Sequence, residues 1–145
     1  MDLPQEIGGL TRLQTLNLAN NRLKELPQPL VQLQNLKSLD LSSNWLDALP
    51  AEISLLKNLY GINLSNNQLF DVSTEVGQLV HLGSLDLSSN RLTSLPTGVA
   101  QLSQLDYLNL ANNMFEKLPP GLFELLKLRI LDLTSNLLPT LPTEI

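Results

Sequence analysis

Few residues in this sequence could carry out chemistry. The chain has 145 residues, no cysteine and a single histidine, His81. Without cysteine there is no thiolate for zinc, no disulfide framework and no thiol nucleophile. One histidine argues against a histidine metal site or a catalytic triad, and Gly8-Gly9 lacks the lysine and spacing of a phosphate-binding loop. The sequence therefore predicts no enzymatic activity, no cofactor and no bound metal.

Charge and hydropathy narrow the classes of partner. The formal net charge is −5, so there is no overall basic footprint for nucleic acid or an anionic lipid surface. No apolar stretch approaches the roughly 18–20 residues of a membrane span, although the chain contains 39 leucines. These features favour binding over chemistry and argue against membrane insertion, but they do not say what is bound.

The secondary-structure elements that would position any functional residue can be read from an internal sequence repeat. Asparagine recurs every 23 residues at one position, and leucine columns recur with the same period. The asparagine positions are Asn21, Asn44, Asn67, Asn90, Asn113 and Asn136. A fixed period of this length is typical of a solenoid, in which stacked copies bury one another's apolar faces.

Each unit reads L-x-x-L-x-L-x-x-N-x-L-x-x-L-P-x-x-I-x-x-L-x-x. Residues 36–41 alternate with period two, which predicts a short strand with one buried face. Residues 49–56 carry apolar residues at spacings of three and four, which predicts a short α- or 3₁₀-turn that begins near Pro50.

This pattern resembles the leucine-rich repeat in its 23-residue Leu-Pro-x-x-Ile form, over six copies and the whole of residues 1–145. The resemblance implies an α/β fold: a curved, right-handed solenoid with a parallel concave sheet and short turns on the convex side. The Leu-Pro variety is similar to intracellular Ras-group and bacterial repeats, which implies a cytoplasmic protein-interaction module. The alternative is the recognition segment of a larger GTPase, kinase or ubiquitin ligase, with its catalytic domain outside this chain.

The asparagine column is expected to be structural, because the chain turns there while still buried and an amide can serve both backbone donors and acceptors. Alternation within the strands leaves two columns facing outward. The first is Thr15, Ser38, Gly61, Ser84, Tyr107 and Ile130. The second is Asn17, Asp40, Asn63, Asp86, Asn109 and Asp132.

The second outward column has two interpretations. Its carboxylates could attract lysine or arginine on a partner, or the column could be repeat consensus that solvates the sheet. Aspartates two repeats apart would be about 10 Å from each other, which is too far to share a small metal ion. On the first interpretation the partner-binding candidates are Asp40, Asn63, Asp86 and Asn109.

Apolar departures from the repeat mark further candidates. Trp45 and Phe70 occupy usually polar positions in adjacent repeats, and exposed aromatics are common hot spots. Trp45 could instead fold over the neighbouring repeat. Tyr107 and Ile130 are neighbours in the first outward column; they could form a contact site or be covered by chain beyond residue 145.

Two structural expectations remain. Ser73 replaces the repeat's proline and is expected to cap the following turn with its hydroxyl. Neither terminal repeat has a visible polar cap, so the sequence predicts a fragment of a longer array or end-to-end self-association.

Overall fold

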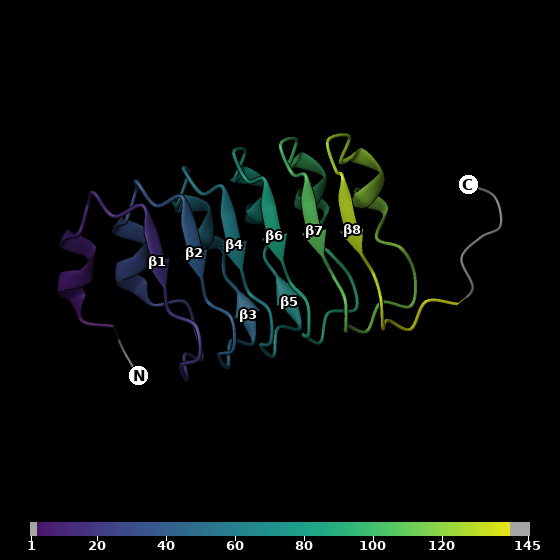
Figure 1. The fold of residues 1–145 in the computed structure, drawn as a ribbon, viewed down its shortest axis with the longest axis horizontal. Coiled ribbons are helices and arrows are strands. Elements are labelled where there is room, and N and C mark those ends of the chain that lie inside the picture. The colour runs from purple at the N-terminus through teal and green to yellow at the C-terminus, as the bar shows by residue number, and fades with distance from the viewer. Residues whose placement is uncertain (1–2, 140–145) are drawn as a thin grey trace.

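The computed structural model describes residues 3–139 as a row of stacked repeats (Figure 1). One sheet contains six parallel strands in the order β1-β2-β4-β6-β7-β8. These strands are β1 (Thr15–Asn17), β2 (Ser38–Asp40), β4 (Gly61–Asn63), β6 (Ser84–Asp86), β7 (Tyr107–Asn109) and β8 (Ile130–Asp132). Each pairs with the next at an offset of 23 residues, as Leu39 does with Ile62. The repeat period therefore sets the register of the sheet.

Short 3₁₀-helices form the opposite layer, behind the sheet in Figure 1. They are η1 (Gln5–Gly9), η2 (Gln28–Gln32), η3 (Ala51–Leu55), η4 (Thr74–Gln78), η5 (Thr97–Gln101) and η6 (Pro120–Glu124). The expected α- or 3₁₀-turns are thus 3₁₀ throughout the described chain. Five of them follow a proline, which supplies the extended conformation before the first turn, as Pro50 does at φ −78° and ψ 167°.

The leucine columns fill the space between the two layers. In the central repeats Leu56, Leu59, Leu64 and Leu69 are completely buried, and each contributes to one continuous core. Toward the ends the same columns are less covered, and Leu10 is 54% exposed. This gradient follows from the solenoid, in which each repeat buries the face of the next. No helix in residues 3–139 is both long enough and apolar enough to span a bilayer.

The third repeat departs from the others at Ser73, and the expected cap is wrong. The Ser73 hydroxyl donates a hydrogen bond to the Glu75 carboxylate, and no side chain caps η4. The serine backbone has φ −61° and ψ 143°, close to the prolines at this position, so the helix starts without a side-chain cap. Ser73 also has the N–H that proline lacks, and donates it to the Leu49 carbonyl at 2.9 Å. This bond extends the pairing of β3 (Ala48–Leu49) with β5 (Asp71–Val72).

Glycines allow η4 and η5 to approach closely. A Cβ on Gly98 would overlap the Thr74 carbonyl oxygen, and a Cβ on Gly77 would overlap the carbonyl oxygen of Gly98. The Gly98 N–H in turn donates to Thr74 Oγ1 at 3.2 Å. The sequence requires glycine at these positions because backbone from the neighbouring repeat occupies the place of a side chain.

Candidate functional site

The asparagine column forms the predicted structural ladder. Asn67 Nδ2 donates to the carbonyl oxygens of Leu41 and Leu64 at 3.0 Å, and Asn67 Oδ1 accepts the Leu46 N–H at 3.0 Å. Asn44, Asn90 and Asn113 repeat this arrangement and are all less than 9% exposed. Their amides are therefore occupied by backbone, and the column is a scaffold for the sheet rather than a ligand site.

The outward aspartate and asparagine column also has a structural role that the sequence reasoning did not identify. In each of the six strands the side-chain Oδ1 accepts the backbone N–H two residues later, as Asp40 does from Ser42 at 2.9 Å. This Asx turn explains why aspartate and asparagine interchange, because both present the same oxygen. The remaining oxygen or amide nitrogen of each side chain is left for other contacts.

The turn ends in an unusual backbone conformation that the residue types also explain. The residue before each ladder asparagine has a positive φ between 53° and 58°. These residues are Asn20, Ser43, Asn66, Ser89, Asn112 and Ser135. Asparagine tolerates this region well among non-glycine residues, and serine is a common turn residue, so this column was readable from the sequence as turn chemistry.

The sheet face brings the predicted polar candidates together. Sheet register aligns Asp40 with Asn63, Asn63 with Asp86 and Asp86 with Asn109. Gly61 lacks a side chain, and the nearest atom to a Cβ there would be Ser84 Cβ at 4.0 Å. The floor is therefore hollowed over β4, with a cavity of about 250 Å³ lined by residues of β2, β4 and β6 and by Tyr107 of β7.

Tyr107 is joined to this polar group. Asn109 Nδ2 donates to Tyr107 Oη at 3.3 Å and lies 3.4 Å from Asp86 Oδ2. Asp86 Oδ1 accepts both the N–H and the hydroxyl of Ser88. The phenol, amide and carboxylate are thus held in one orientation beside the hollow, which suits recognition of a shaped polar surface.

Ile130 lies next to Tyr107 in the register, as predicted, but β8 is the last strand of the described sheet. Ile130 is 56% exposed there. Just after this strand, Thr134 donates its backbone N–H to Asp132 Oδ1 at 2.9 Å, and hydrogen bonds from the Thr134 backbone and side chain lower the pKa of that carboxyl.

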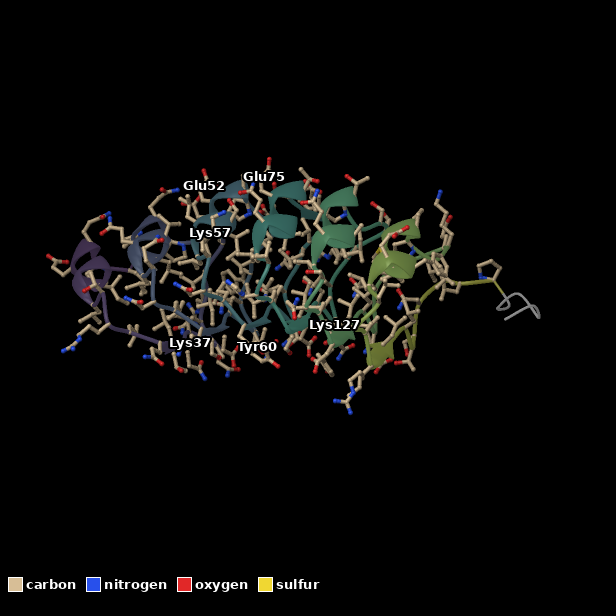
Figure 2. The ribbon with its side chains drawn as sticks, turned by 90° about the horizontal axis from the view of Figure 1, so that it is seen from above. Lys37, Glu52, Lys57, Tyr60, Glu75 and Lys127 are labelled. Atoms are coloured by element: carbon tan, nitrogen blue, oxygen red, sulfur yellow. The ribbon has the colours of Figure 1, made fainter. Side chains whose placement is uncertain are left out.

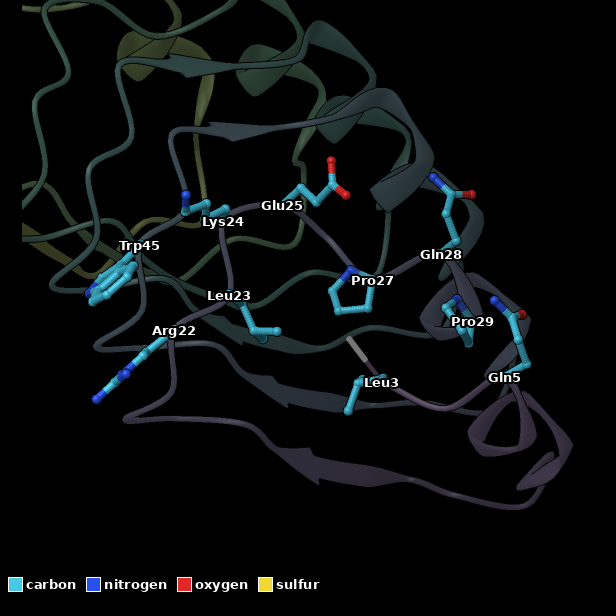
Figure 3. A pocket seen from close by; sticks show the side chains of 10 residues that line it. All are labelled: Leu3, Gln5, Arg22, Leu23, Lys24, Glu25, Pro27, Gln28, Pro29 and Trp45. Atoms are coloured by element: carbon cyan, nitrogen blue, oxygen red, sulfur yellow. The ribbon is translucent and has the colours of Figure 1, made fainter. Parts of the chain in front are cut away.

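Trp45 and Phe70 lie where the strands have ended, away from the sheet floor. The Arg22 guanidinium carbon is 5.8 Å from the centroid of the Trp45 ring, a cation–π arrangement with the preceding repeat. Figure 3 shows the Arg22 and Trp45 side chains at the rim of a hollow, which has a volume of about 610 Å³ and is also lined by Leu3, Leu23 and Lys24. Trp45 is still 46% exposed and Phe70 is 63% exposed, so both rings are available for contact.

Within residues 3–139 no group of three or more histidine, cysteine, aspartate or glutamate residues is arranged to hold a metal ion. His81 is exposed, as its position in the repeat predicts. The two preceding repeats have asparagine at this position. The Asn35 amide donates to the Thr11 carbonyl and the Asn58 amide to the Gln34 carbonyl, each at 2.7 Å. This short second ladder was missed, although asparagine in two successive copies was a visible signal.

Comparison with known proteins agrees with this architecture. The leucine rich repeat family model matches residues 11–69 and 80–138, and the chain belongs to that family. A leucine-rich-repeat protein of Leptospira interrogans is 41% identical in a solved structure, with a TM-score of 0.87 over 97% of this chain and 42% of that one. The crystal structure of PEPR1-AtPEP1 is 28% identical, with a TM-score of 0.75 over 93% of this chain and 20% of that one.

The chain thus spans less than half the length of either of these structures. No curated protein matches its sequence.

Proposed function

We propose that this leucine-rich-repeat array is a protein-interaction module, and that its concave sheet face recognises a partner protein. Asp40, Asn63, Asp86, Tyr107 and Asn109 would make the contacts at its centre. The hydrogen-bonded group of Asp86, Asn109 and Tyr107 beside the Gly61 hollow is the observation that carries the proposal. It presents a fixed shape and three kinds of polar group, a carboxylate, an amide and a phenol, which lowers the ordering cost at binding.

The exit edge, defined by Trp45 and Phe70, would extend the same interface. Its aromatic rings supply apolar area, and the Arg22 guanidinium lies 5.8 Å from the centre of the Trp45 ring. Interfaces commonly combine a few buried aromatic anchors with polar groups that set orientation. Ile130 would contribute at the far end of the sheet, where its side chain faces outward beside Tyr107.

A differential capture experiment tests the proposal. Four versions of the chain are immobilised: the wild type, D40N/D86N, W45A/F70A and, as a control on the convex side, E52Q/E75Q. Asparagine keeps the Asx turn, because Asn63 and Asn109 already accept the same backbone bond. Captured proteins are identified by mass spectrometry, and their affinities are then measured with purified protein.

The proposal expects a partner that the wild type and E52Q/E75Q retain equally. W45A/F70A should weaken its binding at least tenfold, since a hot-spot residue contributes about 2 kcal/mol. D40N/D86N should mainly slow association and reduce its dependence on salt. A partner that binds all sheet-face and exit-edge variants as tightly as the wild type would contradict the proposal.

A further inference from the structure

The charges of this acidic chain are segregated onto different surfaces. The entry edge consists of the six segments that lead from each 3₁₀-helix into a strand: residues 10–14, 33–37, 56–60, 79–83, 102–106 and 125–129. It contains five of the nine lysines and arginines but only one of the fourteen carboxylates, Asp106. The five basic residues are Arg12, Lys37, Lys57, Lys127 and Arg129. The edge thus carries a formal charge of +4, and the remainder of the chain carries −9.

Figure 2 looks down on this edge and shows Lys37, Tyr60 and Lys127 along its sheet side, with Lys57, Glu52 and Glu75 toward the 3₁₀-helices. The five basic residues are all exposed. Two lysines donate to neutral groups: Lys127 Nζ to Gln104 Oε1 at 2.6 Å and Lys57 Nζ to Gln78 Oε1 at 3.0 Å. These bonds orient the ammonium groups without neutralising them.

The entry edge also has a defined shape. A hollow of about 560 Å³ is lined by Tyr60, His81, Gln104, Asp106, Lys127 and Arg129. The Tyr60 ring lies over Gly83 of the next repeat, where a Cβ would come within 2.7 Å of Tyr60 Cζ. Gly83 therefore provides the room that lets the ring cover the wall of the hollow beside the basic side chains.

The length of the edge suits an extended peptide. Backbone hydrogen bonds of 2.8–2.9 Å join Lys37, Tyr60, Gly83, Asp106 and Arg129 in successive repeats. Four steps at the parallel-strand spacing of about 4.8 Å separate Lys37 from Arg129 by about 19 Å. An extended segment of about six residues has this length.

We propose that the entry edge is a second binding surface, separate from the sheet face, that takes an acidic segment of a partner protein. Aspartate or glutamate side chains of the segment would meet Lys127 and Arg129 at one end and Lys37 at the other. Its aliphatic and backbone groups would lie on the Tyr60 ring. A long polyanion such as nucleic acid fits less well, because the acidic remainder of the chain would repel it.

The test uses a fluorescein-labelled hexaglutamate peptide, with hexaglutamine as the neutral probe, and follows fluorescence anisotropy at 20 mM and 150 mM salt. The double variant K127E/R129E removes positive charge from the hollow. K24E/K117E makes the same change in net charge at exposed positions outside the entry edge. D106N removes the one carboxylate of the edge.

The proposal predicts saturable binding of hexaglutamate, absent for hexaglutamine and weaker at the higher salt concentration. K127E/R129E should raise the dissociation constant at least tenfold, and K24E/K117E by less than threefold. D106N should tighten binding two- to fivefold, a gain that misfolding cannot produce. D40N/D86N should not weaken binding, so failure here is distinguishable from failure of the sheet-face proposal.

Three results would overturn the proposal. The first is the absence of saturable hexaglutamate binding at low salt. The second is an equal loss in K24E/K117E, which would mean that net charge and not the entry edge decides. The third is tighter binding of a single-stranded dT oligonucleotide than of the peptide, which would assign the surface to nucleic acid.

Discussion

The asparagine ladder makes a quantitative prediction for the variant N67A. The Leu41 and Leu64 carbonyls, which accept from Asn67, also accept from Asn44 and Asn90, so each keeps one donor after the substitution. The Leu46 N–H loses its acceptor, the Asn67 Oδ1 oxygen, and Leu46 is only 1% exposed. A buried, unpaired N–H costs about 1–3 kcal/mol, and the lost amide hydrogen bonds add about 1 kcal/mol. We expect N67A to lower the free energy of unfolding by about 2–4 kcal/mol.

The variant N67D separates the donor and acceptor roles of the same side chain. Aspartate keeps an oxygen for the Leu46 N–H but turns a second oxygen toward carbonyl oxygens and buries a charge. At neutral pH it should therefore destabilise the chain more than alanine does. Asn21, at the end of the ladder, is partly exposed and makes its bonds within its own repeat, so N21A should cost less than about 1 kcal/mol.

Urea denaturation followed by far-UV circular dichroism measures these differences, and the single tryptophan, Trp45, reports separately on the N-terminal repeats. Q68A is the control, because Gln68 is exposed and adjacent in the chain. It should stay within about 0.5 kcal/mol of the wild type. If N67A is no less stable than Q68A, or if N67D is more stable than N67A at neutral pH, the ladder interpretation is refuted.

Two further predictions concern the convex side. G98A should lower the free energy of unfolding by about 1–3 kcal/mol, because its Cβ would displace the Thr74 backbone. G121A should change it by less than about 0.5 kcal/mol, because the atom nearest to its Cβ would be 3.5 Å away. Equal unfolding midpoints for the two variants would contradict the close approach of η4 and η5. Glu75 has its pKa lowered from 4.5 by the Ser73 hydroxyl and its own backbone N–H. A carboxyl whose pKa is lowered by folding stabilises the fold at pH values above its unfolded-state pKa, and this contribution is lost as the pH falls. The wild type's extra free energy of unfolding over E75Q should therefore shrink below about pH 4.5 in urea titrations. A difference that grew on acidification would contradict this prediction.

The repeat made most of the fold predictable. Strand positions, buried leucines and the asparagine ladder follow from a 23-residue period, because each copy must bury the next in the same register. The period also placed Asp40, Asn63, Asp86 and Asn109 on one face, as the sheet has them. For Trp45 the sequence left open whether the ring is exposed or covers the neighbouring repeat; Trp45 and Phe70 lie away from this face, with 46% and 63% of their surface exposed.

Side-chain orientation between repeats was not predictable in the same way. The Arg22–Trp45 contact and the packing of Tyr60 over Gly83 depend on side-chain rotamers at the contact between two repeats, and the bond from Ser73 to Glu75 depends on rotamers within one repeat. The charge asymmetry of the entry edge was present in the sequence. It becomes visible only when residues separated by 23 positions are grouped by edge rather than by net charge.

Mapping a captured partner's footprint by NMR tests the central claim most directly. Backbone amide shifts of the isotope-labelled chain are recorded while the unlabelled partner is added. Recognition through the sheet face predicts the largest changes at Asp40, Asn63, Asp86, Tyr107 and Asn109, with η3 and η4 unchanged. Changes confined to the convex 3₁₀-helices, with an unperturbed sheet, would contradict it.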